Sequence, residues 1–191
     1  MIAIPDRAQV SVLIPAAGRG ERLGRGPKAA LPLAGRPVLH WVVDKARQLG
    51  SEILVAAGPD LPVPPDCRRV EGGATRQESV QRLAAAATRP WCLLWDAARP
   101  FASLALARAV LAAAAEGGAA SACLDSENTH ARVRDGIVCE ILPARWAALT
   151  QTPQAFATPL LQQATAQAAA VGFTAQSTGE LWLHAGHRLL A

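Results

Sequence analysis

The chain has 191 residues, of which 51% are hydrophobic and 18% charged, and its formal net charge is +4 at pH 7. These values are typical of one globular domain with a sizeable core, and they exclude a disordered protein. The basic excess is modest and forms no long run, which favours a small anionic ligand over nucleic acid. The sequence has no apolar run of membrane-spanning length and no signal-peptide pattern. We therefore expect a soluble cytoplasmic protein without a nucleic-acid or membrane partner.

A glycine-rich basic loop follows the first apolar segment. Residues 10–14 are apolar except for Ser11 and largely β-branched, and the run ends at Pro15, which predicts a buried strand that leads into a loop. The loop contains four glycines and four basic residues: Gly18, Gly20, Gly24, Gly26, Arg19, Arg22, Arg25 and Lys28. Glycines let backbone N–H groups close around a ligand, and the basic side chains add positive charge. Because loops after buried parallel strands lie at the ligand-binding edge of α/β sheets, we interpret this loop as a polyphosphate site.

Helix-like and strand-like segments alternate along the rest of the chain. Helical spacing and end signals predict helices over residues 37–49, about 72–88, 103–116 and 158–172. Apolar runs predict strands over residues 52–57, 91–95 and 119–124, and a final short strand over 187–190. This alternation is typical of βαβ units. We therefore predict one α/β domain over residues 1–191, Rossmann-like, with a mostly parallel sheet flanked by helices.

A predicted hairpin interrupts the alternation at residues 129–142. Asp135-Gly136 lies between two short strand-like runs, and this dipeptide is a strong signal for a tight hairpin turn. A lone two-stranded ribbon is only marginally stable in water. The arm at about residues 127–147 is therefore expected to pack on another surface. That surface is either the same arm of a second subunit, which would make a homodimer, or the arm's own domain.

Two common phosphate-binding motifs are excluded. The dinucleotide fingerprint needs a third glycine where Leu23 stands, and no strand-ending acidic residue follows at the right distance. A nicotinamide-dependent oxidoreductase is therefore disfavoured. A P-loop needs Gly-Lys-Ser/Thr, whereas Lys28 follows a proline and precedes Ala29.

Five short motifs occur in the order seen in one enzyme family. The first reads Pro-Ala-Ala-Gly-x-Gly-x-Arg-Leu-Gly, then Pro-Lys and Leu-x-Leu-x-Gly-x-Pro-Val-Leu, over residues 15–39. The others are Gly-Gly-x-x-Arg-x-x-Ser-Val at 72–80, Asp-Ala-Ala-Arg-Pro at 96–100, the hairpin, and Gln-Thr-Pro-Gln-x-Phe at 151–156. On these motifs the chain resembles the sugar- and polyol-phosphate nucleotidyltransferases. Within them it is most similar to the 2-C-methyl-D-erythritol 4-phosphate cytidylyltransferase family of non-mevalonate isoprenoid biosynthesis.

The resemblance implies transfer of CMP from CTP to 2-C-methyl-D-erythritol 4-phosphate, with release of pyrophosphate. An acceptor phosphate oxygen attacks the α-phosphorus in line, so the protein positions the reactants and stabilises charge. The resemblance also implies a Mg²⁺ ion and a homodimer that forms through the arm.

The site residues implied by the resemblance fall into three groups. Arg22 and Lys28 would contact the triphosphate and act as catalytic residues. The nucleotide would be bordered by Ala16, Ala17, Gly18, Gly20, Gly73 and Ser79. The metal and acceptor side would consist of Asp96 at the Mg²⁺, Ala97, Arg99 and Thr152. The arm residues Thr129 and Arg145 would hold the acceptor from the neighbouring subunit, and Arg145 would also be catalytic.

Several departures from the family pattern concern the acceptor side. The arm reads Asn-Thr-His-Ala at 128–131 instead of Asp-Thr-x-Lys, Trp95 replaces a histidine, and residues 174–178 read Thr-Ala-Gln-Ser-Thr instead of Thr-Asp-Glu-Ala-Ser. The family's Asn-x-Lys-x-Thr segment has no counterpart before Ala191, so a shortened C-terminus is expected. Two alternatives therefore stay open: a nucleotidyltransferase for another polyol phosphate, such as ribitol 5-phosphate, and a CTP-binding protein without turnover.

Overall fold

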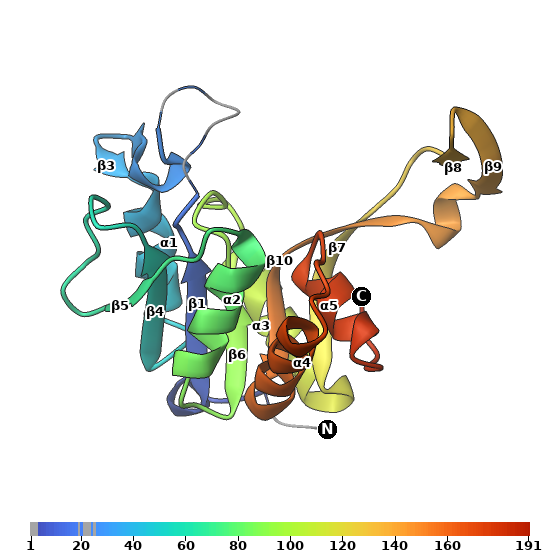
Figure 1. Cartoon of the computed structure of the whole chain (residues 1–191). Coiled ribbons are helices and arrows are strands. Elements are labelled where there is room, and N and C mark those ends of the chain that lie inside the picture. Colours follow the sequence, from blue (N-terminus) through green and yellow to red (C-terminus); the bar gives the residue numbers. More distant parts are fainter. Residues whose placement is uncertain (1–3, 19, 21–23, 25) are drawn as a thin grey trace.

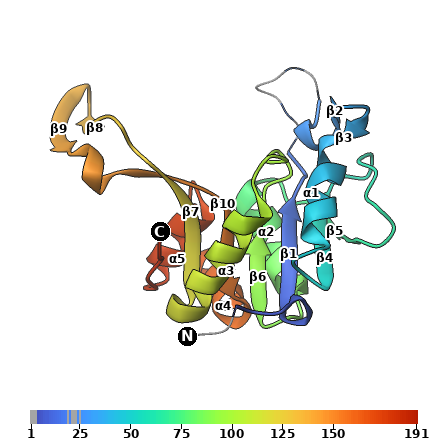
Figure 2. The ribbon, with the colours of Figure 1, turned by 180° about the vertical axis from the view of Figure 1, so that it is seen from behind.

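The computed structural model describes residues 4–18, 20, 24 and 26–191. Within them, a six-stranded sheet lies between two layers of helices, which Figures 1 and 2 show from opposite sides. Its strands are β1 (Val10–Pro15), β4 (Glu52–Ala57), β5 (Arg68–Glu71), β6 (Trp91–Leu94), β7 (Ala119–Asp125) and β10 (Ala148–Ala157). The predicted α/β class with a mostly parallel sheet is confirmed.

The order of the strands creates a crevice at one edge of the sheet. The order is β5-β4-β1-β6-β10-β7, in which β5, β4, β1 and β6 run parallel and β10 is antiparallel to both of its neighbours. The chain moves outward from β1 through β4 to β5 and then returns to β6 on the other side of β1. The loops that leave β1 and β6 therefore diverge. Such a switch point is where open α/β sheets bind ligands.

The helices cover both faces of the sheet. They are α1 (Val38–Ala46), α2 (Arg76–Ala86), α3 (Leu104–Gly117), α4 (Thr158–Ala170) and α5 (Thr178–His184). Residues of α1 and α3 share one core with Val12 and Ile14 of β1, whereas α2, α4 and α5 share the other core with Leu13. Because both faces of β1 are buried, its sequence is apolar at successive positions rather than alternating, with Ser11 as the exception. Among the described residues, no helix combines the length and the apolar character that a bilayer crossing needs.

Local signals explain where several helices begin and end. The hydroxyls of Thr75 and Ser103 accept hydrogen bonds from backbone N–H groups in the first turns of α2 and α3, as N-cap residues do. Gly118 has a φ of 84° and ends α3 in the left-handed conformation that glycine favours. The predicted helix over 37–49 is observed as the shorter α1.

Some elements were not expected from the sequence. β10 contains Pro153, and a proline inside an apolar run counts against a strand. The pairing of β10 with β7 shifts register between Gln151 and Gln154, so that Pro153 lies outside the regular ladder. The strand β5 and the helix α5 were also not predicted. β5 is an edge strand with charged residues, and α5 is short. The predicted final strand over 187–190 is wrong in extent, because in this segment only Leu190 forms a bridge, with Ala120.

The predicted hairpin is confirmed and projects from the domain. It consists of β8 (His130–Arg134) and β9 (Ile137–Leu142), and both turn residues, Asp135 and Gly136, have positive φ angles of 50° and 77°. Figures 1 and 2 show it at the end of two extended segments, away from the sheet. The remaining elements are β2 (Pro32–Leu33) paired with β3 (Arg36–Pro37), and the 3₁₀ turns η1 (Arg7–Gln9), η3 (Lys28–Ala30) and η4 (Ala144–Trp146).

Candidate active site

A cleft of about 990 Å³ lies at the carboxyl ends of β1 and β6. Its walls come from the loop after β1, the loop before α2, the loop after β6 and the turn η3. The predicted site residues that line it are Ala16, Ala17, Gly18, Gly20, Lys28, Gly73, Ser79, Asp96, Ala97 and Arg99. The structure therefore brings together residues from three of the five motifs.

The other predicted site residues lie elsewhere. Arg22 is outside the described residues. Thr152 lines a neighbouring cavity. Thr129 and Arg145 lie on the projecting arm, where both are exposed, and the Arg145 guanidinium stands 4.9 Å from the ring centre of Trp146. Neither is among the described residues that line the two cavities of the domain.

Two glycines allow the cleft loops to approach one another. A Cβ atom at Gly72 would overlap the Cβ of Ala17, so glycine is needed where the loop before α2 meets the loop after β1. Gly20 has a φ of 70°, and a Cβ there would overlap the carbonyl of Gly26. The packing of these loops therefore requires glycine at both positions, in addition to any requirement set by a ligand.

The hydroxyl of Ser79 is already engaged within its own loop. It accepts a hydrogen bond from the Gly73 N–H at 3.0 Å and donates to the Thr75 carbonyl, also at 3.0 Å. The Ala74 N–H donates to the Glu78 carboxylate at 2.8 Å. These contacts shape the loop before α2, so the contribution of Ser79 to the cleft wall is first of all the shape of that loop.

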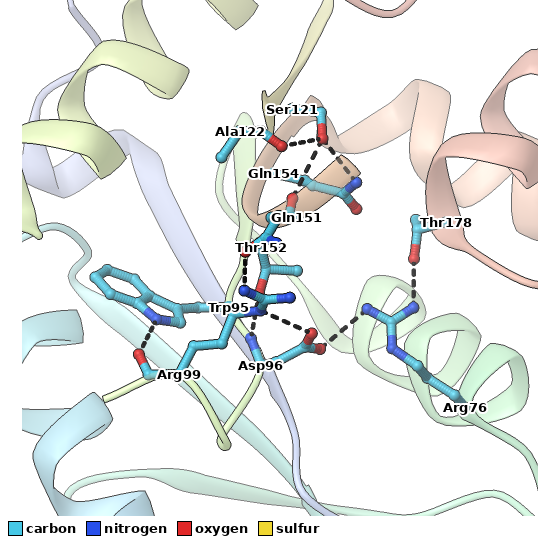
Figure 3. A network of polar contacts seen from close by, with 10 residues as sticks. All are labelled: Arg76, Trp95, Asp96, Arg99, Ser121, Ala122, Gln151, Thr152, Gln154 and Thr178. Carbon is cyan, nitrogen blue, oxygen red and sulfur yellow. Dashed lines mark hydrogen bonds and ion pairs between the residues drawn. The ribbon is translucent and has the colours of Figure 1, made fainter. Parts of the chain in front are cut away.

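Asp96 is the centre of a polar network (Figure 3). Its backbone N–H donates to the Thr152 hydroxyl at 3.2 Å, and one carboxylate oxygen accepts from Arg76 Nη2 at 3.0 Å. The other carboxylate oxygen lies 3.8 Å from Arg99 Nε. The carboxylate thus lies between two guanidinium groups, which hold it in the cleft wall.

Arg76 and Gln151 extend this network, and the motifs by themselves indicate no role for either residue. Arg76 also donates from Nη1 to the Thr178 hydroxyl at 3.0 Å, and Thr178 is buried at the start of α5. Arg99 donates from Nη1 to the side-chain oxygen of Gln151 on β10. Arg76 lies in the motif at 72–80 and Gln151 in the motif at 151–156, but the local sequence does not reveal which distant residues they contact.

A second cavity of about 340 Å³ adjoins the first and shares Ala98 and Arg99 with it. Its other lining residues are Pro100, Phe101, Ala102, Leu106, Ala122, Cys123, Leu124, Gln151 and Thr152. The wall is largely apolar, with Arg99, Gln151 and Thr152 as its hydrogen-bonding side chains. A small ligand with an apolar part and an anionic end fits this chemistry.

Comparison with known proteins identifies the family. The family model for 2-C-methyl-D-erythritol 4-phosphate cytidylyltransferase matches residues 10–189. The chain belongs to this family. A cytidylyltransferase of that name from Thermus thermophilus is 45% identical over 175 residues, which cover 91% of this chain and 82% of the relative. The Deinococcus radiodurans enzyme of the same name is 39% identical, and the match covers 93% of this chain and 78% of that protein.

The fold of the family agrees with the structure. The crystal structure of the Thermus thermophilus cytidylyltransferase is similar to this chain with a TM-score of 0.80 and 38% identity, over 95% of this chain and 87% of that one. The resemblance predicted from the motifs is therefore confirmed over nearly the whole chain.

The charge of the cleft suits the substrates of this family. The charged residues described in its lining are Lys28, Arg76, Arg99 and Asp96, so cations exceed anions. No group of three or more His, Cys, Asp or Glu side chains that could hold a metal occurs among the described residues. Mg²⁺ nevertheless commonly binds through one carboxylate together with substrate phosphates and water. Asp96 in a cleft suited to a triphosphate fits that donor set.

Proposed function

We propose that this chain transfers CMP from CTP to 2-C-methyl-D-erythritol 4-phosphate and releases pyrophosphate, a step of non-mevalonate isoprenoid biosynthesis. The proposal is supported chiefly by one observation: the cationic cleft at the β1–β6 switch point is built from the motifs that the chain shares with its cytidylyltransferase family. The cytoplasmic location expected from the sequence stays a prediction.

Lys28 and Arg22 are proposed to bind the triphosphate and to offset the charge that develops at the α-phosphorus. Lys28 is exposed in the cleft wall, where its ammonium group can reach an anionic ligand. Phosphoryl transfer needs little covalent chemistry from the protein, so fixed positive charge and alignment account for most of the catalysis. Ala16, Ala17, Gly18, Gly20 and Gly73 would form the wall against the nucleotide.

The acceptor is proposed to bind where the two cavities meet. Arg99 borders both cavities and its side chain is already oriented by Gln151 and Asp96, so it can bind the acceptor phosphate. Thr152 would close this end of the pocket, and the apolar wall of the second cavity suits the methyl-bearing carbon chain.

The arm is proposed to pair with a second copy and to complete the acceptor site. Its exposed apolar residues, Val133, Ile137, Val138 and Ile141, would be covered by the partner. Thr129 and Arg145 would then reach the cleft of the neighbouring subunit, because the arm that carries them projects away from the sheet of its own chain (Figure 1).

Asp96 is the residue proposed to hold Mg²⁺ together with the triphosphate. The bound ion would neutralise charge on the phosphate oxygens. Arg76 and the Thr152 hydroxyl hold Asp96 in the cleft wall through the carboxylate and the backbone N–H respectively.

Pyrophosphate release tests the proposal directly. The protein would be incubated with Mg²⁺, one nucleoside triphosphate from CTP, UTP, ATP and GTP, and either 2-C-methyl-D-erythritol 4-phosphate or ribitol 5-phosphate. We expect release only with CTP and methylerythritol phosphate. Lys28→Ala should lower it by at least about a hundredfold, as loss of one charge-stabilising group commonly does.

Arg108→Ala is the matched control, because Arg108 is an exposed cation on α3 that is not among the described cleft residues. Its rate should equal that of the wild type. Release with ribitol phosphate alone would reassign the acceptor. CTP binding without release from either acceptor would instead support a nucleotide-binding protein without turnover.

A further inference from the structure

The loop over residues 96–102 carries Asp96 and Arg99, and two side chains hold its backbone from outside the cleft. Lys45, in the last turn of α1, donates from Nζ to the carbonyl oxygens of Pro100 at 2.6 Å and Ala102 at 2.8 Å. Trp95 donates from its indole Nε1 to the carbonyl oxygen of Arg99 at 3.1 Å (Figure 3). Three carbonyl groups of one short loop are therefore bound by two side chains.

In the described part of the chain, neither side chain borders the ligand space. Trp95 is fully buried in the core beneath the loop, and Lys45 is half-buried in the last turn of α1. Neither is among the described lining residues of the two cavities. A lysine ammonium that donates to two carbonyl groups at these distances makes charge-assisted hydrogen bonds, which are stronger than neutral ones. Both residues thus act on the loop rather than on a ligand.

The two ends of the loop are held by different contacts. The Asp96 end is fixed by the Thr152 hydroxyl and by Arg76. From Arg99 onward, the loop's described backbone contacts are the bonds to Lys45 and Trp95, the Arg99 N–H to Asp96 carbonyl bond of 3.0 Å, and a long Ala102 N–H to Arg99 carbonyl bond of 3.4 Å. Removing the Lys45 ammonium would therefore release mainly the Arg99 end.

We propose that Lys45 and Trp95 are positioning residues for the acceptor side of the site, and that they act through Arg99. They hold the 96–102 loop so that the Arg99 side chain stays between Asp96 and Gln151, at the border of the two cavities. This inference rests on the proposed function, in which Arg99 binds the acceptor phosphate.

Steady-state kinetics separate this role from a general loss of structure. Lys45→Met keeps the length of the side chain and removes its donors, so the KM for the acceptor should rise about tenfold, the loss expected when one strong hydrogen bond is broken. The KM for CTP should stay within about twofold of the wild type. Lys45→Arg retains donors and should recover most of the loss. Trp95→Phe, which removes one neutral donor, should act in the same direction but less.

Arg108→Met is the matched control, since it also removes a cation from a helix, here an exposed one, and should change neither KM. Equal rises in the KM for CTP and the acceptor in Lys45→Met, or no rise in either, would overturn the proposal. All variants would be assayed well below their measured melting temperatures, so that unfolded protein does not contribute.

A double-mutant cycle tests whether Lys45 acts through Arg99. If it does, Lys45→Met should add nothing to the loss already caused by Arg99→Ala, because the group that Lys45 positions is absent. If Lys45→Met costs the same factor in both backgrounds, the two residues act independently and the proposal is wrong.

Nuclear magnetic resonance gives a readout that does not depend on activity. The sequence contains two lysines, Lys28 and Lys45, so ¹⁵N-lysine labelling should yield two side-chain ammonium signals, and Lys28→Ala assigns them. We expect slow proton exchange at Lys45 and fast exchange at Lys28. Fast exchange at Lys45 would overturn the proposed contact. If proton exchange at Lys45 is slow but the protein turns over no acceptor, the contact exists and the proposed function is wrong. The assignment of Lys45 and Trp95 to acceptor binding would then be wrong as well.

Discussion

At the scale of single residues, Arg76 connects the candidate metal ligand to the C-terminal helix. It contacts Asp96 through one guanidinium nitrogen and Thr178 through another. An ion pair this exposed adds little to folding stability, so we expect that Arg76 acts mainly on the orientation of Asp96.

Arg76→Met should lower kcat/KM about tenfold, the cost of one charge-assisted hydrogen bond, and leave the melting temperature nearly unchanged. Steady-state kinetics and thermal unfolding check this, with Thr178→Val as a control that spares the Asp96 contact. An unaltered kcat/KM in Arg76→Met would contradict the expected role.

At the scale of elements, Glu52 joins β4, β1 and the loop between α2 and β6. Its carboxylate accepts hydrogen bonds from the hydroxyls of Ser11 and Thr88 and from the Thr88 N–H. Partial burial opposes ionisation of Glu52, but these hydrogen bonds outweigh it, and the pKa of Glu52 lies below its ordinary value of 4.5. A lowered pKa stabilises the fold above pH 4.5, and this stability is lost as the pH falls through the pKa of the folded state.

The pH dependence of Glu52→Gln tests this account. At pH 7 the variant should have a free energy of unfolding about 2 kcal/mol below that of the wild type, because charge-assisted hydrogen bonds are lost. The difference should shrink as the pH falls below 4.5. Urea unfolding at a series of pH values measures it. Glu116→Gln, at the exposed end of α3, is the control. A difference that does not vary with pH would show that the charge of Glu52 is not the cause.

At the scale of the whole molecule, the arm exposes apolar side chains that the domain does not cover. Ile137 and Ile141 of β9 are 67% and 58% exposed. If a second copy covers them, Ile137→Ser with Ile141→Ser should shift the protein from dimer to monomer, since each buried isoleucine contributes about 1.5–3 kcal/mol. Sedimentation velocity measures the shift. Val171→Ser, an equally exposed position at the end of α4, should not alter the assembly. A wild-type protein that sediments as a monomer at all concentrations would refute the proposed dimer.

The motifs made much of the cleft predictable from the sequence. The apolar run of β1, its abrupt end at Pro15 and the following glycines locate a ligand loop, because a buried strand and a glycine-rich turn are local properties of the chain. Asp135-Gly136 likewise predicts the hairpin, since both residues accept positive φ. The segments that were missed have weak or contradictory local signals: β10 contains a proline, and β5 carries charges at the edge of the sheet.

The sequence by itself determined the alternation of strands and helices, the basic loop and the hairpin, because each depends on residues within one segment. The tertiary structure alone decided which distant residues meet. Insertion of the antiparallel β10 between β6 and β7 places Thr152 and Gln151 beside Asp96 and Arg99. The packing of α1 brings Lys45 under the same loop. Such contacts join residues about 50 positions apart, and no local pattern specifies them, because they depend on how the sheet orders its strands.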